Sequence, residues 1–453
     1  MGKLTRDMTV GSPFKHIISF AIPMLLGILF QQFYNMVDTM VIGRWVGVEA
    51  LAGVGSTGSI NFMIVGFCNG LGMGFAIPVA RAFGAKEFSA LRKYVTNAVW
   101  LSIALASVIT VFATVFCRDI LTLMQTPSDA IDYAYDYIFI IFAGIPILYA
   151  YNMLAAIIRA LGDSRSPVYF LIISATLNII LDIISVTVLD MGVMGPALAT
   201  VISQAISAIL CLIYMIKKFD VLKIQRGEWR IRPRRMLTLA AMGVPMGLQF
   251  SITAIGSVIL QTSVNSLGSQ IVATIASGGK LVMFFACVLD ALGGTMTTYV
   301  GQNMGIGDHK RIKKGVLTAM AIGTVYSVIA LGVLFFFGKP LATLFIDSGE
   351  TAILGNVHTY IIIQGIFYVA LSAVNIFRPS IQAMGYSPLA ILAGVLEMIA
   401  RTFVGFVLVP KFGFIIACFA SPLAWVLADL FLVPTLFVCC NRLKKNFKND
   451  IHP

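Results

Sequence analysis

Long apolar segments separated by short polar loops run through the whole chain. A helix needs about 20 apolar residues to cross a bilayer, and such windows recur twelve times. They lie near residues 15–42, 50–82, 94–117, 133–158, 167–189, 193–216, 237–264, 271–303, 315–338, 354–383, 388–409 and 412–438. The pattern predicts an all-α integral membrane protein with twelve transmembrane helices, several of them kinked at internal prolines such as Pro23, Pro78, Pro146 and Pro245.

Composition agrees with a membrane protein. The chain is 58% hydrophobic and 11% charged, whereas soluble domains carry roughly 25% charged residues. The polar stretch 1–15 is followed by an apolar run too long for a signal peptide, so we predict that this run is retained as a span. The seven cysteines show no CxxC spacing and the four histidines do not cluster, so neither a metal site nor a disulfide is indicated.

Basic residues are distributed unequally between the two sets of loops. Of the 32 basic residues, 26 fall in alternate loops and four fall in the opposite loops. The 26 include Arg378, which is predicted to lie in a loop. The other two, Lys280 and Arg401, lie within predicted helices. Because basic loops stay in the cytoplasm, we predict a cytoplasmic-membrane protein with both termini inside the cell. Anionic lipid headgroups account for the net charge of +12 without a nucleic-acid partner.

The two halves of the chain repeat each other. AIPMLLG at 21–27 is echoed by GVPMGLQ at 243–249, and 70–93 aligns without gaps to 291–314. Each half contains six predicted helices, an even number, so both halves enter the membrane with the same orientation. We therefore predict two six-helix lobes related by a parallel pseudo-twofold repeat, with an N-lobe at 1–216, a basic linker at 217–235 and a C-lobe at 236–453.

Polar residues inside the predicted spans mark candidate functional positions. Asp38 lies in an apolar run, where a carboxylate costs at least ~2.5–3.5 kcal/mol, and shares a helical stripe with Gln31 and Asn35. Asn178 and Asp182 share a face of segment 167–189 at a similar predicted depth. Two nearby carboxylates favour loading a proton or binding a small cation. The alternative is a purely structural hydrogen-bond network.

The second half carries a different polar set, namely Asp290, Lys280, Glu397 and Arg401. Glu397 and Arg401 are four residues apart on one helix and are expected to neutralise each other, with a gating or substrate role as the alternative. We expect Lys280 to pair with Asp290 or Glu397. The position equivalent to the aspartate of the first segment is Leu260, so ion chemistry is predicted to concentrate in the first half.

Two glycine-rich stretches resemble nucleotide-binding loops, but the sequence around them does not fit such a loop. GVGSTG at 53–58 matches GxGxxG, but no strand precedes it and a membrane segment follows it. We predict that these glycines, and those of GLGMG at 70–74, are points of close helix packing.

Several motifs resemble those of one known family. They are QQFYNMVDTMVIGRWVG (31–47), RALGDSRSP (159–167), LNIILD (177–182) and VGQNMG (300–305). With the twelve-helix, two-lobe pattern they resemble the multidrug and toxic compound extrusion (MATE) transporters, in the prokaryotic branch named for the DNA-damage-inducible protein. The resemblance implies that Asp38, Asn178 and Asp182 form a proton or cation site in the first lobe, with Thr200 contributing.

The chain departs from the sodium-coupled branch of that family, which carries acids on the seventh and tenth helices. Here the seventh segment has Gln249 and Thr253, and the tenth has no acid. The resemblance therefore favours a proton over sodium as the coupling ion. The two-lobe repeat predicts alternating access by rocking of the lobes, and we expect ion binding to reshape the first helix at a hinge near Pro23 and Gly27.

Together these features predict a transporter with no enzymatic activity. We expect an antiporter that exports amphipathic, often cationic, organic compounds in exchange for a proton or sodium ion, with no other cofactor. Membrane lipids surround it, and a monomer is sufficient for the mechanism. The rival predictions are a lipid-linked oligosaccharide flippase of the same superfamily and, from another class, a membrane receptor or enzyme.

Overall fold

The computed structural model describes residues 6–124, 126, 130–344, 346 and 350–449. Its contacts divide the chain into two compact units: unit 1 comprises Met1–Asp7 and Leu26–Phe250, and unit 2 comprises Met8–Leu25 and Ser251–Pro453. The chain therefore changes unit inside α1 (Pro13–Val41) and again inside α10 (Pro233–Asn265). The predicted lobes, by contrast, divide at the linker 217–235, which leaves α1 whole and separates only the first turn of α10 from the rest of that helix.

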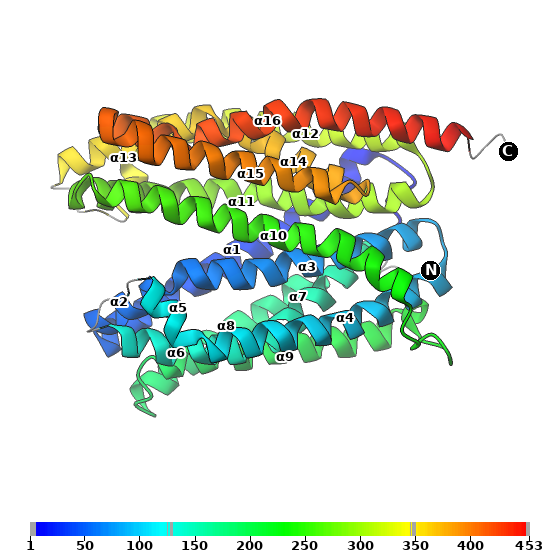
Figure 1. Ribbon diagram of the computed structural model, residues 1–453, viewed down its shortest axis with the longest axis horizontal. Helices are drawn as coiled ribbons and strands as arrows, with labels where there is room; N and C mark the ends of the chain where they lie inside the picture. Colours follow the sequence, from blue (N-terminus) through cyan, green and yellow to red (C-terminus); the bar gives the residue numbers. More distant parts are fainter. Residues whose placement is uncertain (1–5, 125, 127–129, 345, 347–349, 450–453) are drawn as a thin grey trace. The chain divides into compact units, whose positions relative to one another are not determined.

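Unit 1 is built from helices of both long and short types. Besides its parts of α1 and α10 they are η1 (Ile42–Val46), α2 (Val48–Ser56), α3 (Gly58–Gly84), α4 (Phe88–Val115), α5 (Cys117–Leu123), α6 (Ile131–Ala143), α7 (Ile145–Ala160), α8 (Ser166–Thr187), α9 (Met194–Lys218) and η2 (Asp220–Leu222). The helices α8 and α9 pack along their lengths, as do α3 and α7 (Figure 1).

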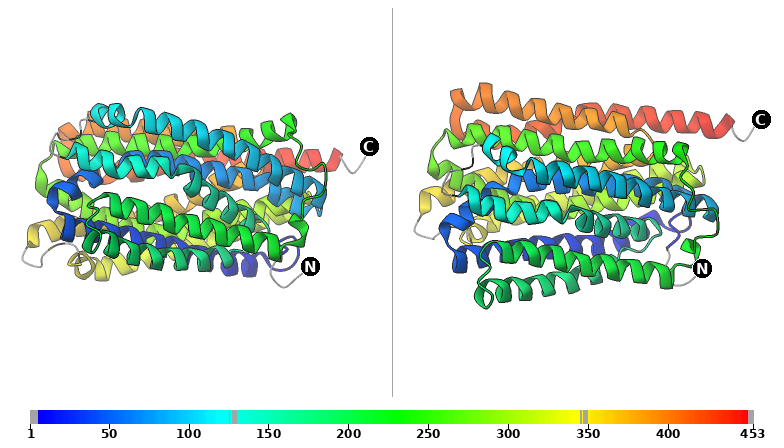
Figure 2. Two further views of the ribbon diagram at one scale, coloured as in Figure 1. Left: turned by 90° about the horizontal axis from the view of Figure 1, so that it is seen from below. Right: turned by 60° about the horizontal axis from the view of Figure 1, so that its bottom comes forward.

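Unit 2 contains a similar succession of long helices, with fewer short elements between them. Besides its parts of α1 and α10 they are α11 (Ser269–Gly305), α12 (His309–Ala342), α13 (Thr351–Ile366), α14 (Tyr368–Ala383), α15 (Ser387–Phe403), η3 (Val404–Leu408) and α16 (Val409–Asn449). The helices α11 and α14 pack together, and α15 packs against α16; Figure 2 shows the latter pair from two further directions.

The helix count agrees with the predicted twelve spans once helix breaks are considered. Within the described residues, nine helices are long and apolar enough to span a membrane, and eleven if each of two bent pairs counts as one span. One of these spans is the 59-residue run Ser387–Lys445. Gly413 interrupts it with a left-handed φ of 66°, and dividing the run there gives twelve.

Two of the predicted helices are broken in the middle. The segment 133–158 forms α6 and α7, bent by 49°, and 354–383 forms α13 and α14, bent by 48°. Pro146 therefore lies in the first turn of α7 instead of inside a helix, because proline lacks the N–H that a continuing helix would need. No proline accompanies the second break, at Phe367.

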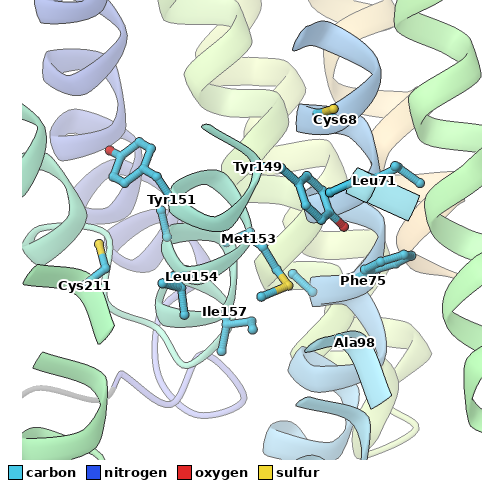
Figure 3. Close-up of a cluster of buried hydrophobic side chains, with 14 of the residues drawn as sticks. Cys68, Leu71, Phe75, Ala98, Tyr149, Tyr151, Met153, Leu154, Ile157 and Cys211 are labelled. Carbon is cyan, nitrogen blue, oxygen red and sulfur yellow. The ribbon is translucent and has the colours of Figure 1, made fainter. Parts of the chain in front are cut away.

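The core of unit 1 is assembled from side chains on α3, α4, α7 and α9. Leu71, Phe75, Ala98 and Tyr149 are almost fully buried in it, and Figure 3 shows how they lie around Met153 and Ile157. The hydroxyl of Tyr149 accepts a hydrogen bond from Ser102 Oγ at 3.1 Å. The apolar cluster gives the cavity described below a packed wall on one side.

Close glycine contacts join α3 to the first part of α10. A Cβ atom added to Gly74 would lie 2.3 Å from Gly243 Cα, and one added to Gly70 would lie 2.5 Å from Met246 O. Small residues at four-residue spacing let two helix backbones approach in this way, so the predicted packing role is confirmed for 70–74. In 53–58 it holds for Gly53, while a Cβ on Gly55 or Gly58 would meet open space.

A peptide strap precedes each repeat's first helix. Before α1, the backbone of Met8 donates from its N–H to Gln302 and accepts at its carbonyl from Arg311 and Asn303, all within unit 2. Before α10, the carbonyl of Glu228 accepts from Thr96, and its carboxylate pairs with Arg92 at 2.7 Å, all within unit 1. Each strap thus fixes the segment that leads into one repeat onto helices of the other repeat.

Candidate functional site

A cavity of about 390 Å³ opens within unit 1. Amide, hydroxyl and carboxyl side chains form much of its wall, contributed by α1, α3, α6, α7 and α9. They are Gln31, Gln32, Asn35, Asp38, Asn61, Asn69, Asn152, Gln204, Tyr34, Tyr137, Tyr151 and Thr200. The predicted stripe of Gln31, Asn35 and Asp38 therefore faces one cavity, which confirms that these three residues share a face.

A buried carboxyl pair lies where α1, α8 and α9 meet. Asp182 is fully buried, Asn178 is 1% exposed and Asp38 is 8% exposed. The side-chain amide of Asn178 donates to Asp182 Oδ1 at 3.5 Å and to Thr200 Oγ1 at 3.4 Å. The carboxyl of Asp38 interacts electrostatically with the Asp182 carboxyl and the Thr200 hydroxyl. The structure thus brings together the four residues that the sequence and the resemblance assigned to one site.

The carboxyl pair is incompletely satisfied. Within the described part of the chain, Asp38 Oδ1, Asp182 Oδ2 and Asn178 Oδ1 are buried and accept no hydrogen bond. Two ionised carboxylates cannot bond to each other, since neither has a proton to donate. A shared proton or a small cation would satisfy these oxygens, and the amide and hydroxyl oxygens nearby would complete the ligand set of a cation.

Asp38 connects the cavity to the carboxyl pair. Its side chain lines the cavity, whereas Asp182 and Asn178 do not and lie behind it. Anything bound in the cavity therefore meets Asp38 first. A compound in the cavity and the proton or cation of the pair would both act on this one carboxylate.

Sequence reasoning missed several members of the site. Tyr34, one turn before Asp38, is buried, and its hydroxyl is within hydrogen-bonding reach of Gln31 and Gln204. The cavity-lining amides Asn61, Asn69, Asn152 and Gln204 were also missed. A weak signal existed for Tyr34, which lies on the same helical stripe as Asp38; the others show no pattern that sets them apart from polar residues at helix contacts.

Glu397, an acid of unit 2, has two arginine partners. Glu397 accepts a hydrogen bond from Arg378 and forms the predicted ion pair with Arg401, whose Nη2 lies 3.5 Å from Oε2. The prediction that Arg378 lies in a loop is wrong, because α14 continues through Pro379 to Ala383 and buries this side chain. Asp429 on α16, which the sequence analysis did not single out, interacts electrostatically with Arg378.

The remaining predicted residues of the second repeat are spread over α10 and α11. Asp290 Oδ1 accepts a hydrogen bond from Asn375 Nδ2 at 2.9 Å. Lys280 lies exposed on α11, and its pairing with Asp290 or Glu397 stays a prediction. Gln249 lies half-buried on α10, outside the lining of the unit 1 cavity.

The proposed hinge residues lie on either side of a unit boundary. Pro23 is inside α1 and belongs to unit 2, and Gly27 belongs to unit 1, since the division falls between Leu25 and Leu26. A Cβ on Gly27 would lie 3.1 Å from Val168 Cγ2, so this part of α1 packs closely on α8.

Comparison with known families identifies the chain. The MatE family model matches it twice, at residues 23–184 and 245–407. The chain belongs to the MatE family. The two matches begin at Pro23 and Pro245, the pair that revealed the internal repeat, so the repeat and the resemblance to MATE transporters are confirmed. MatE proteins are multi-pass membrane transporters and not enzymes.

Individual relatives resemble this MatE protein over most of its length. The probable multidrug resistance protein YoeA of Bacillus subtilis is 26% identical, covering 84% of each chain. The FAD transporter of Shewanella oneidensis is 24% identical, covering 81% of each chain. A crystal structure of MATE in complex with MaL6 superposes with a TM-score of 0.90 at 21% identity, covering 98% of this chain and 100% of that one.

Proposed function

We propose that this MatE protein exports amphipathic organic compounds across the plasma membrane in exchange for a cation, with the proton as the coupling ion. The observation that carries the proposal is the position of Asp38, which lines the cavity and also interacts with the buried Asp182 carboxyl. The similarity to the multidrug resistance protein YoeA supports export of organic compounds.

The coupling follows from competition for one carboxylate. A proton entering from outside binds the Asp38–Asp182 pair and removes the charge that would hold a cationic compound in the cavity. The compound is then released outward. Loss of the proton to the cytoplasm restores the carboxylate, which binds the next compound. A sodium ion would use the same oxygens together with those of Asn178 and Thr200.

The path of the chain supports an alternating-access cycle in which α1 bends. This helix carries Asp38 in unit 1 and begins in unit 2, and the change of unit falls between Pro23 and Gly27. A proline and a glycine are suited to a hinge, because the first removes a backbone hydrogen bond and the second is conformationally free. Bending here would couple the protonation state of Asp38 to the arrangement of the units.

Charge distribution supports a plasma-membrane location with cytoplasmic termini. Arg378 leaves the loop count because it is buried in α14, but the excess of basic residues in alternate loops remains large. The ends themselves, 1–5 and 450–453, lie outside the described residues.

The cavity supports an exporter over a lipid-linked oligosaccharide flippase. Among the described residues, the lining of the unit 1 cavity contains no lysine, arginine or histidine, and a pyrophosphate-linked lipid would need basic partners there. For the same reason we do not propose FAD as a substrate of this chain, because FAD also carries phosphates.

Proteoliposomes containing this protein alone would test the proposal. We expect a proton gradient, and not a sodium gradient, to drive ethidium transport by the wild type. Asp38→Asn should abolish this transport, whereas Asp136→Asn, which alters an exposed carboxylate on α6, should retain it. Full transport by Asp38→Asn, or transport independent of both gradients, would overturn the proposal.

A further inference from the structure

We propose that the unit 1 cavity binds neutral, planar heterocycles that carry amide-type hydrogen-bond donors and acceptors, a class distinct from lipophilic cations. The inference rests on the proposed function and adds a second class of ligand for the same cavity, beside the cationic compounds that compete with the proton. It rests on the side chains that line the wall, on their hydrogen-bonding state and on the charge they provide.

Carboxamides dominate the polar wall. Gln32 and Asn35 come from α1, Asn61 and Asn69 from α3, and Asn152 from α7, so amide groups approach a bound compound from three helices. Each carboxamide offers an N–H donor beside a carbonyl acceptor. This paired arrangement matches the adjacent donor and acceptor on the edge of a nucleobase, as in the bidentate contact of asparagine with adenine.

Some of this hydrogen-bonding capacity is unused by the protein. Asn61 Oδ1 is buried and accepts no hydrogen bond from any described residue. Asn152 uses one amide hydrogen on the carbonyl of Leu148, at 2.9 Å, within its own helix, and its side-chain carbonyl remains for another donor. A buried acceptor that the fold does not satisfy is suited to a donor supplied by a ligand.

Aromatic rings provide faces for a planar ligand. The cavity is lined by four aromatic side chains, namely Phe62, Tyr137, Tyr151 and Phe250. Aromatic side chains stack on the face of a nucleobase whatever its identity. The volume of about 390 Å³ lies within the roughly 300–1,000 Å³ typical of small-molecule sites. The wall therefore combines aromatic surfaces that can stack on a planar ligand with amides that can hydrogen-bond to its edge.

The charge of the lining selects against anionic ligands. Asp38 is the one charged side chain that the described residues contribute to the lining, and its carboxyl already interacts with Asp182. An anion would enter a cavity that lacks a basic partner. A neutral heterocycle needs no counter-ion, and it would use the amides that a lipophilic cation cannot satisfy.

Binding of tritiated adenosine to the purified full-length protein tests this inference. Adenosine is a neutral nucleoside whose adenine edge presents the donor and acceptor that carboxamides match. We expect saturable binding by the wild type and about tenfold or weaker binding by Asn61→Leu and Asn69→Leu, which keep side-chain size but remove the amide. Gln261→Leu is the matched control, because this carboxamide bonds Asn265 on the exposed side of α10.

The outcomes separate this inference from the proposed function. Monodisperse elution and an unchanged unfolding temperature would establish that the two asparagine variants fold. No adenosine binding by the wild type, or equal binding by a folded Asn61→Leu variant, would overturn the inference even if ethidium export works. Specific adenosine binding without gradient-driven export would uphold it and refute the export proposal.

Discussion

At the scale of single residues, Asp38 has the environment on which the account depends. It is 8% exposed, faces the cavity on one side and meets the Asp182 carboxyl on the other. A lone carboxylate in an apolar span was recognisable in the sequence because burying it is costly. The amides Asn61 and Asn69 were not, since an uncharged amide costs less to bury and its helix face is fixed only by packing.

Thr200 supports the carboxyl pair through its hydroxyl. It accepts from the Asn178 amide and interacts electrostatically with Asp38, so Thr200→Val removes a hydrogen bond while keeping the shape of the side chain. The loss of a hydrogen bond costs about 1 kcal/mol, which predicts roughly fivefold slower proton-driven ethidium export in proteoliposomes. Thr200→Ser should restore most of the rate. Equal rates for the valine variant and the wild type would argue against this role.

Arg378 is predicted to stabilise unit 2. Removing one partner of a buried ion pair leaves an uncompensated charge and costs about 3–5 kcal/mol, and Glu397 would keep only the 3.5 Å contact to Arg401. We therefore expect Arg378→Met to lower the thermal unfolding temperature of the purified protein. Arg118→Met is the control, because the Arg118–Asp132 pair is exposed and should contribute little. Similar unfolding temperatures for both variants would contradict this assignment.

At the scale of elements, helix existence was predictable and helix continuity was not. The twelve apolar windows follow from bilayer thickness, and Pro146 marks the break between α6 and α7. The equivalent break between α13 and α14, at Phe367, carries neither proline nor glycine at its centre, so only the packing of unit 2 determines it. The change of unit inside α1 and inside α10 has no local sequence signal either.

The α3–α10 contact depends on glycine. The added Cβ of Gly74 would collide with the backbone of Gly243, so Gly74→Leu should separate these helices and sharply reduce the yield of folded protein. Gly55→Ala is the matched control, because its Cβ would meet open space; alanine there should be neutral or stabilising by up to about 1 kcal/mol. Size-exclusion profiles and unfolding temperatures measure both effects. A well-folded Gly74→Leu protein would refute the close contact.

The strap before α10 should respond to pH through Glu228. The Arg92 guanidinium, which donates to this carboxylate, holds the pKa of Glu228 below its ordinary value. Since the folded pKa is depressed, the pair contributes stability above about pH 4.3, the unfolded value, and loses it as the pH falls through the folded pKa. At pH 7, Glu228→Gln should therefore lower the free energy of unfolding by about 1–3 kcal/mol. This variant should unfold at a lower temperature than the wild type.

The difference between wild type and Glu228→Gln should shrink as the pH falls below about 4.3, and it should vanish once Glu228 is protonated in both the folded and unfolded states. Asp220→Asn provides the control, because Asp220 pairs with Lys223 on an exposed turn and should change unfolding little at either pH. A difference for Glu228→Gln that is constant from pH 7 to pH 3 would exclude the ion pair as its cause.

At the scale of the whole molecule, the repeat was the strongest signal in the sequence. The offset between Pro23 and Pro245 reappears in the two matches to the MatE family, and both halves fold into the same order of helices. The change of unit within α1 and α10 was not predictable, because it depends on contacts between residues far apart in the chain, such as Met8 with Gln302. These two helices connect the units through which a transport cycle would act.

The most direct test of the account is to measure proton release when a cationic compound binds. Purified protein in weakly buffered detergent solution would be titrated with tetraphenylphosphonium while a pH indicator reports released protons. If the compound and the proton compete for Asp38, the wild type should release about one proton per cation bound near neutral pH, and Asp38→Asn should release none. Binding to the wild type without proton release, or undiminished release by Asp38→Asn, would contradict the account.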